Sequence, residues 1–247
     1  MKRGSTTAAM PRYRVTIRDA ALILVILALV GFVAFAQIRS VPHALLISVD
    51  DSLSVVQRMR QNDGRLEKRT LSGVIEAAQH CVRKARVVVE AFAHEADALY
   101  QQVAYDQTPQ DINEVTAAVK PLLERPAPGE GTHFSTMLSA LAGRCDEERA
   151  RNPREVVDVL IITDTCLDLP HGSGKAAMER EIHATIQQAT RLSACKNLGK
   201  VLIGPADDYT ARSIATRQLF KPLGAHLVIT SSRDEMVTAF KTFGKGE

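Results

Sequence analysis

The sequence predicts an α/β protein, a Rossmann-like three-layer sandwich with helices flanking a mainly parallel central sheet, preceded by one transmembrane helix. Three observations predict this class. Short runs rich in Val, Ile and Leu alternate with longer amphipathic stretches. The short runs show little polar alternation, which is typical of parallel strands buried on both faces. Near the N-terminus, one apolar stretch is long enough to cross a bilayer.

The predicted strands and helices follow one another along residues 43–243, which we expect to form a single domain. The strands are predicted at residues 44–49, 86–92, 156–163, 200–203 and 226–229. The helices are predicted at residues 66–84, 112–123, 135–148, 175–196, 209–220 and 233–243. Two parallel strands that are neighbours in a sheet must be joined by a long crossover connection, which is usually a helix. The alternation of strands and helices therefore favours a parallel sheet.

Residues 20–38 are the predicted transmembrane helix. Gln37 is their only strongly polar residue, and the helix would be about 28 Å long. Five basic residues and one acid precede it, so the positive-inside rule keeps residues 1–19 in the cytoplasm and the domain in the periplasm or outside the cell. The alternative is a cleavable secretory signal, because Ala34-Phe35-Ala36 looks like a small-residue cleavage site; this reading also exports the domain. We favour the uncleaved anchor because the apolar run exceeds the usual length of a signal.

The part of the chain that follows the predicted transmembrane helix carries almost no net charge. The chain has 31 basic and 28 acidic residues. Five of the basic residues and one of the acidic residues lie within residues 1–38, so the part that follows is near neutral. Such a domain gives little support for nucleic-acid binding.

Export of the domain would permit disulfide bonds, and four cysteines can pair in three ways. The alternative is that the cysteines are free and buried. The four cysteines are Cys81, Cys145, Cys166 and Cys195.

Small oxygen-bearing side chains follow two predicted strands and precede one predicted helix. They are Asp50, Ser52 and Ser54 after the first strand, Asp164 at the end of the third, and Thr132 before the helix at 135–148. Ligands of open α/β sheets bind beyond the carboxyl ends of the strands. Short hydroxyls and carboxylates are ligands that suit Mg²⁺. These segments therefore predict a metal site.

The pattern Asp50-x-Ser52-x-Ser54, then Thr132, then Asp164 resembles the metal-ion-dependent adhesion site of the von Willebrand factor A domain. The resemblance covers about residues 43–243. It implies that the three hydroxyl groups coordinate Mg²⁺ directly, with Mn²⁺ or Ca²⁺ as alternative ions. It also implies that the two carboxylates act through water or hold the hydroxyls.

One coordination position is left open by this ligand set. The resemblance implies that an Asp or Glu carboxylate of a partner protein fills it. We therefore expect a membrane-anchored domain for adhesion or assembly, not an enzyme, whose partners could be subunits of a larger membrane complex. Leu53 and Thr165 depart from the pattern, because they stand where the family usually has other residues, Gly in the case of Leu53.

Two other functions stay open from the sequence. In a metal-independent scaffold subunit, Asp50 and Asp164 would cap the adjacent helices or loops. In a metal-dependent hydrolase, the ion would activate water, with His133 or His171 as the general base. The joint occurrence of the five metal-site residues in the family's order favours adhesion.

Overall fold

The computed structural model describes the strands and most helices of the domain. The described residues are 25–28, 43–50, 52, 71, 73–75, 77–79, 85–92, 96–105, 108–124, 131–163, 167, 169, 172–204, 214–230 and 233–240. The chain divides into two compact units, Met1–Val41 and Pro42–Glu247.

Residues 25–28 are the described part of the predicted transmembrane segment, and they are helical with exposed side chains. Among the residues that the structure describes, no helix has the length and apolar character needed to cross a membrane. The rest of segment 20–38 lies outside the described residues, so the transmembrane helix is not confirmed and stays a prediction.

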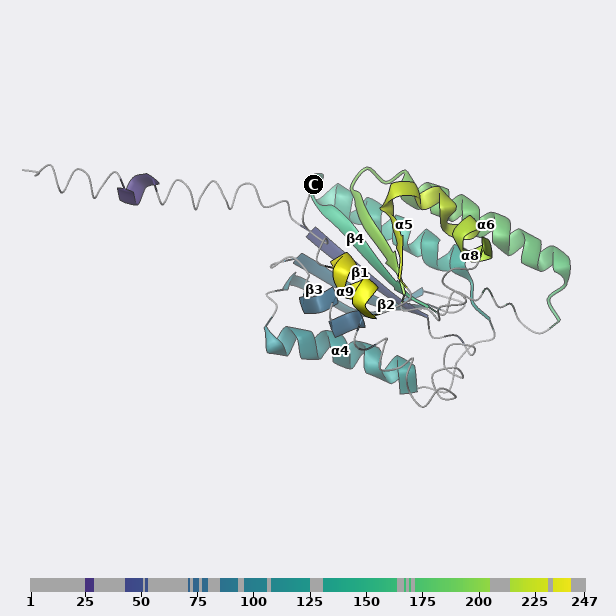
Figure 1. Ribbon diagram of the computed structural model, residues 1–247, viewed down its shortest axis with the longest axis horizontal. Helices are drawn as coiled ribbons and strands as arrows, with labels where there is room; N and C mark the ends of the chain where they lie inside the picture. The colour runs from purple at the N-terminus through teal and green to yellow at the C-terminus, as the bar shows by residue number, and fades with distance from the viewer. Residues whose placement is uncertain are drawn as a thin grey trace, which may run out of the picture. The chain divides into compact units, whose positions relative to one another are not determined.

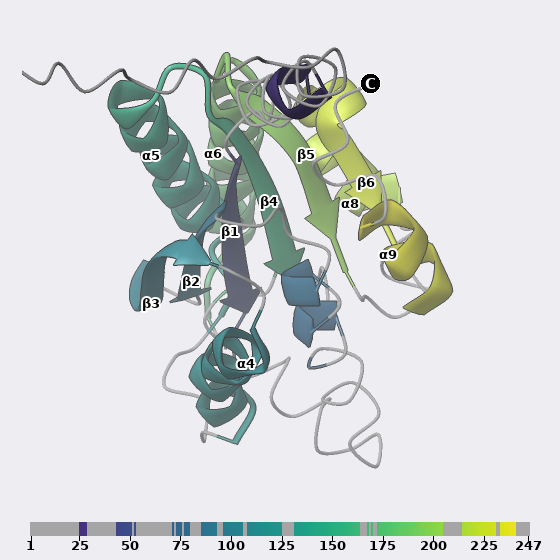
Figure 2. The same cartoon turned by 90° about the vertical axis from the view of Figure 1, so that its left-hand side faces the viewer.

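The strands of the second unit form one six-stranded sheet in the order β3-β2-β1-β4-β5-β6 (Figures 1 and 2). Their bounds are β1 His43–Asp50, β2 Ala85–Phe92, β3 Ala96–Tyr105, β4 Val156–Ile162, β5 Leu198–Ile203 and β6 Leu227–Ile229. β1 pairs in parallel with β2 and with β4, and the parallel pairing continues through β5 to β6. β3 is antiparallel to β2. The predicted mainly parallel sheet is confirmed.

Helices cover both faces of this sheet (Figures 1 and 2). Their bounds are α4 Pro109–Glu124, α5 Phe134–Arg151, α6 Lys175–Ser193, α8 Ile214–Phe220, the 3₁₀ helix η1 Lys221–His226 and α9 Arg233–Phe240. α5, α6, α8 and η1 contribute side chains to the core on one face, and α4 and α9 to the core on the other. The described residues between 71 and 79 are helical, and Leu71, Val74, Ala77 and Ala78 pack in the core on the α4 side of the sheet.

β1 shows why the strands read as continuous apolar runs. All eight of its residues are buried. Leu45, Ile47 and Val49 pack in the core on the α4 side, whereas Ala44 and Leu46 pack under α5. Because successive side chains of a strand point to opposite faces, a strand covered on both faces has no position for solvent-exposed polar residues.

The five predicted strands are confirmed to within two residues, and the structure adds β3, which the sequence did not predict. Among the described strands, β3 lies at the edge of the sheet next to β2. Its sequence, ADALYQQVAY, carries polar residues and lacks the continuous apolar run of a central strand. The predicted helices are confirmed where they are described, except that α6 ends at Ser193, three residues before the predicted end. Residues 66–70, 72, 76, 80–84, 209–213 and 241–243 lie outside the described residues.

Two of the four cysteines are described, and both are free thiols. Cys145 of α5 and Cys195, just after α6, are both buried, and Cys145 Sγ donates a hydrogen bond of 3.4 Å to Asn197 Oδ1. Burial raises the pKa of both thiols. Cys81 and Cys166 lie outside the described residues, so a disulfide between these two stays open.

Candidate metal centre at the carboxyl edge of the sheet

The carboxyl ends of β1 and β4 lie side by side at the point where the order in which the chain adds strands to the sheet reverses. From β1 the chain adds β2 and β3 on one side, and from β4 it adds β5 and β6 on the other. Such a topological switch point leaves a crevice beyond the strand ends, where open α/β sheets bind ligands. Asp50 ends β1, and Thr163 directly follows β4.

Asp50 is almost fully buried, with 1% of its surface exposed. Thr163 Oγ1 donates a hydrogen bond of 2.6 Å to Asp50 Oδ2, which links the two strand ends. The backbone N–H of Ser52 donates a second one, of 3.0 Å, to Asp50 Oδ1. This contact two residues along the chain is the one an Asx turn makes, so the carboxylate also shapes the chain as it leaves the strand.

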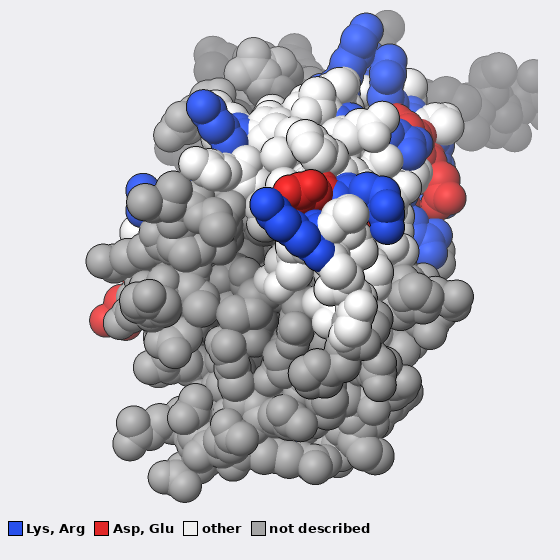
Figure 3. Space-filling view, turned by 90° about the vertical axis from the view of Figure 1, so that its right-hand side faces the viewer, with Lys and Arg blue, Asp and Glu red and all other residues white. Residues whose placement is uncertain are grey.

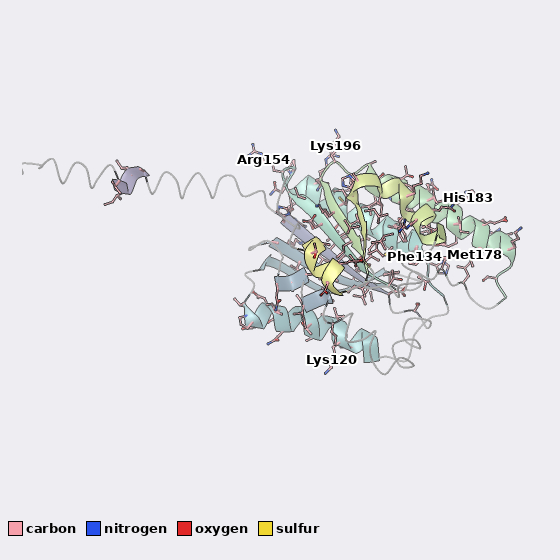
Figure 4. All side chains as sticks on the ribbon, in the orientation of Figure 1. Lys120, Phe134, Arg154, Met178, His183 and Lys196 are labelled. Atoms are coloured by element: carbon pink, nitrogen blue, oxygen red, sulfur yellow. The ribbon has the colours of Figure 1, made fainter. Side chains whose placement is uncertain are left out.

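Thr132 lies in the segment that leads into α5. Gly131 has a φ of 95°, a left-handed conformation that residues with a Cβ rarely adopt, and the turn depends on it. Two residues after Thr132, Phe134 anchors the start of α5 in the core (Figure 4). Its ring centroid lies 6.3 Å from that of Phe92, the last residue of β2 and the register partner of Asp50. The start of α5 is thereby held at the same edge of the sheet as Asp50.

The side chain of Thr132 is fully buried, yet its Oγ1 has no hydrogen-bond partner among the described residues. Leaving a buried hydroxyl unpaired costs roughly 1–3 kcal/mol. Such groups call for an explanation, and an ion at the site is one. Ser52 is also fully buried. A hard cation coordinated by Thr132 Oγ1 would supply the missing partner, so the donor chemistry fits Mg²⁺.

Of the five predicted ligands, the structure describes Asp50, Ser52 and Thr132. Ser54 and Asp164 lie outside the described residues, as does His171. Within the part of the chain that is described, no cluster of three or more His, Cys, Asp or Glu side chains could hold a metal. A site built mainly from hydroxyls forms no such cluster. The complete ligand set therefore stays a prediction.

Glu181 of α6 is a residue of this region that the sequence did not indicate. Its buried carboxylate accepts hydrogen bonds of 2.9 Å from both the backbone N–H and the Oγ of Ser135. His133 Nδ1 lies 3.5 Å from the same carboxylate. Glu181 and Ser135 are 46 positions apart, and no local pattern signals a contact over that distance.

Charged side chains gather in the core at the opposite, amino end of the strands. Arg86 of β2 pairs with Glu148 of α5, and His43 Nδ1 lies 3.2 Å from Asp158 Oδ2. Glu155, just before β4, is also buried. Desolvation, followed by repulsion from Glu148, raises its pKa from the ordinary 4.5 to about 7, although Arg86 and His43 act in the opposite direction.

Surface charges of both signs lie close together. Lys175 and Glu179 form an ion pair of 3.7 Å on α6, and Arg191 and Asp146 form one of 3.6 Å. Figure 3 shows the same mixture, with blue and red side chains adjacent on the described part of one face. Exposed pairs of this kind contribute little stability.

Comparison with protein-family models and with curated protein sequences finds no match. Solved structures do match, among them a von Willebrand factor type A protein from Catenulispora acidiphila, at 16% identity and a TM-score of 0.50. The match covers 82% of this chain and 42% of that protein, so the chain spans less than half the length of this relative.

Two further structures match with the same TM-score of 0.50 and 14% identity. Proximal thread matrix protein 1 from the mussel byssus, with a zinc-occupied metal-ion-dependent adhesion site, matches over 82% of this chain and 47% of its own. An aerotolerance-related membrane protein from Bacteroides fragilis matches over 83% of this chain and 97% of its own. Together these likenesses show that the chain has the von Willebrand factor A fold, which confirms the resemblance at the level of the fold.

Proposed function

We propose that this chain of von Willebrand factor A fold is a membrane-anchored, extracytoplasmic interaction domain that binds a partner protein through Mg²⁺. One observation carries the proposal: the buried Thr132 hydroxyl that lacks a hydrogen-bond partner in the described structure, at the sheet edge where Asp50 ends β1. Mn²⁺ or Ca²⁺ are the alternative ions, since both accept oxygen ligands.

Five residues would hold the ion. Ser52, Ser54 and Thr132 would coordinate it directly, while Asp50 and Asp164 would act through water or orient the hydroxyls. Asp50 suits an orienting role, because the hydrogen bonds from Thr163 and from the Ser52 backbone fix its carboxylate. When bound, the ion supplies a positive charge with one open coordination position.

The partner would fill that position with an Asp or Glu carboxylate. Such a ligand is favoured because a divalent cation held largely by neutral hydroxyls keeps most of its positive charge. We infer binding rather than catalysis because the expected ligands hold an ion without supplying a general base. His133, the candidate base beside the site, faces the Glu181 carboxylate.

Anchoring through residues 20–38 would hold the domain close to the membrane. The apolar composition of this segment and the five basic residues before it support the topology with residues 1–19 in the cytoplasm. Partners would then be sought among proteins of the same membrane, including the subunits of a larger complex.

Capture of partners from solubilised membranes tests the proposal. Full-length chain is immobilised in Mg²⁺ or in EDTA, and Thr132→Ala is compared with Thr190→Ala, a control on an exposed position of α6. We expect a partner that the wild-type chain and the control retain in Mg²⁺ and that EDTA or Thr132→Ala releases. Capture that survives both EDTA and Thr132→Ala would overturn the proposal.

A metal-independent scaffold is the second candidate, and the hydrogen bonds of Asp50 favour it. A carboxylate that joins two strand ends and caps a turn has a structural role without any ion. This candidate predicts equal capture of the partner in Mg²⁺ and in EDTA. It also predicts that Asp50→Ala weakens capture only as far as it lowers the stability of the fold.

A further inference from the structure

The start of α5 lacks the capping that helices usually carry in their own sequence. His133 is the N-cap residue, and its side chain makes no capping hydrogen bond. The first turn of α5 contains no acidic residue. The first backbone N–H groups of a helix have no partner within it, and they carry a partial positive charge. α5 therefore needs a hydrogen-bond acceptor from elsewhere in the fold.

Glu181 of α6 supplies that acceptor. Its Oε1 accepts the backbone N–H of Ser135, and its Oε2 accepts the Ser135 hydroxyl, both at 2.9 Å. On its own helix, Thr185 Oγ1 donates a hydrogen bond of 3.3 Å to Oε1, which helps to fix the carboxylate. Glu181 is 8% exposed, so these bonds are largely shielded from water.

The same carboxylate reaches the residue next to Thr132. His133 Nδ1 lies 3.5 Å from Glu181 Oε2, so Glu181 contacts the chain one and three positions after Thr132. Between these two contacts, the Phe134 ring is packed against Phe92 and against Phe220 of α8, with a centroid distance of 5.5 Å to the latter. The backbone that directly follows Thr132 is thus held from two sides.

We infer that Glu181 is a positioning residue of the metal centre, which holds the start of α5 so that Thr132 Oγ1 stands ready to coordinate the ion. This inference rests on the proposed function. Groups that orient metal ligands without touching the ion commonly change metal affinity 10- to 100-fold when removed. Glu181 differs from the expected ligands because it lies on α6 and does not touch the ion. It acts through its hydrogen bonds to Ser135 at the start of α5.

Titration of Mg²⁺ into the full-length chain, kept in mild detergent, tests this role. Glu181→Ala is expected to weaken Mg²⁺ binding about 10-fold. The matched control is Glu179→Ala, which removes an exposed carboxylate of the same helix that pairs with Lys175. Glu181→Gln retains one carbonyl oxygen for the Ser135 N–H, so its affinity should fall between those of the wild type and Glu181→Ala. Equal affinity of Glu181→Ala and the wild type would overturn the inference.

Hydrogen exchange of the metal-free chain separates positioning from general stability. In Glu181→Ala, exchange of the Ser135 amide should accelerate, while amides in the middle of α5, such as that of Leu141, keep their protection. Equal acceleration throughout α5 would overturn the inference in favour of a structural role. A wild-type chain that binds no Mg²⁺ would overturn the inference and the proposed function together, whereas Mg²⁺ binding that Glu181→Ala leaves unchanged would overturn the inference alone.

Discussion

Thr163 Oγ1 donates a hydrogen bond of 2.6 Å to Asp50 Oδ2, and this bond joins the carboxyl ends of β1 and β4. These neighbouring strands begin the two halves of the sheet, so the bond crosses its switch point. Both side chains are buried, which shields the bond from water. The orientation of Asp50 at the candidate metal centre therefore depends on a residue outside the recognised motif.

Replacing Thr163 by Val tests this dependence. The variant keeps the β-branched shape but removes the donor, which leaves Asp50 Oδ2 buried without this hydrogen bond. We expect a loss of about 1–3 kcal/mol in the free energy of unfolding, measured by urea denaturation. Thr163→Ser keeps the hydroxyl and serves as the control. A Thr163→Val chain as stable as the wild type would show that the bond contributes nothing.

Thr132→Val should have the opposite effect on stability. It replaces a buried hydroxyl that has no partner in the described structure with a methyl group of similar size. Removing the unpaired polar group should stabilise the metal-free chain by about 1 kcal/mol. Urea denaturation in EDTA measures this gain, and Mg²⁺ should then fail to raise the unfolding midpoint. A destabilised variant in EDTA would mean that the hydroxyl has a partner in the apo protein.

Stability should fall as the pH rises from about 4.5 to about 7, because burial and Glu148 raise the pKa of Glu155 to about 7. Between these values the folded chain keeps a proton that the unfolded chain has lost, so raising the pH favours unfolding. Glu155→Gln should flatten this part of the profile, which urea denaturation between pH 4.5 and 8 would show. The control is Glu179→Gln, an exposed carboxylate of α6. If the Glu155→Gln and wild-type profiles ran parallel, this explanation would fail.

The two described thiols should react slowly in the native chain. Burial raises the pKa of Cys145 and of Cys195, so little thiolate is present for alkylation at pH 8. Iodoacetamide labelling after reduction, mapped by mass spectrometry, should show little modification at either position until urea is added. Native labelling as fast as that of a free peptide thiol would contradict the buried placement of both residues.

Local patterns in the sequence predicted much of this fold and only part of the site. The central strands were found because burial on both faces requires continuous apolar runs, whereas β3 was missed because an edge strand tolerates polar residues. Asp50, Ser52 and Thr132 were predicted from their place in a motif. Thr163 and Glu181 act on partners 113 and 46 positions away, and only the packed fold brings such residues together.

Calorimetric titration of Mg²⁺ into the full-length chain measures whether this domain holds an ion through Thr132. We expect a single saturable site in the wild type and none in Thr132→Ala, with circular dichroism showing that the variant keeps its fold. A wild-type chain that gives no binding signal, or a Thr132→Ala chain that binds Mg²⁺ with undiminished affinity, would contradict this expectation.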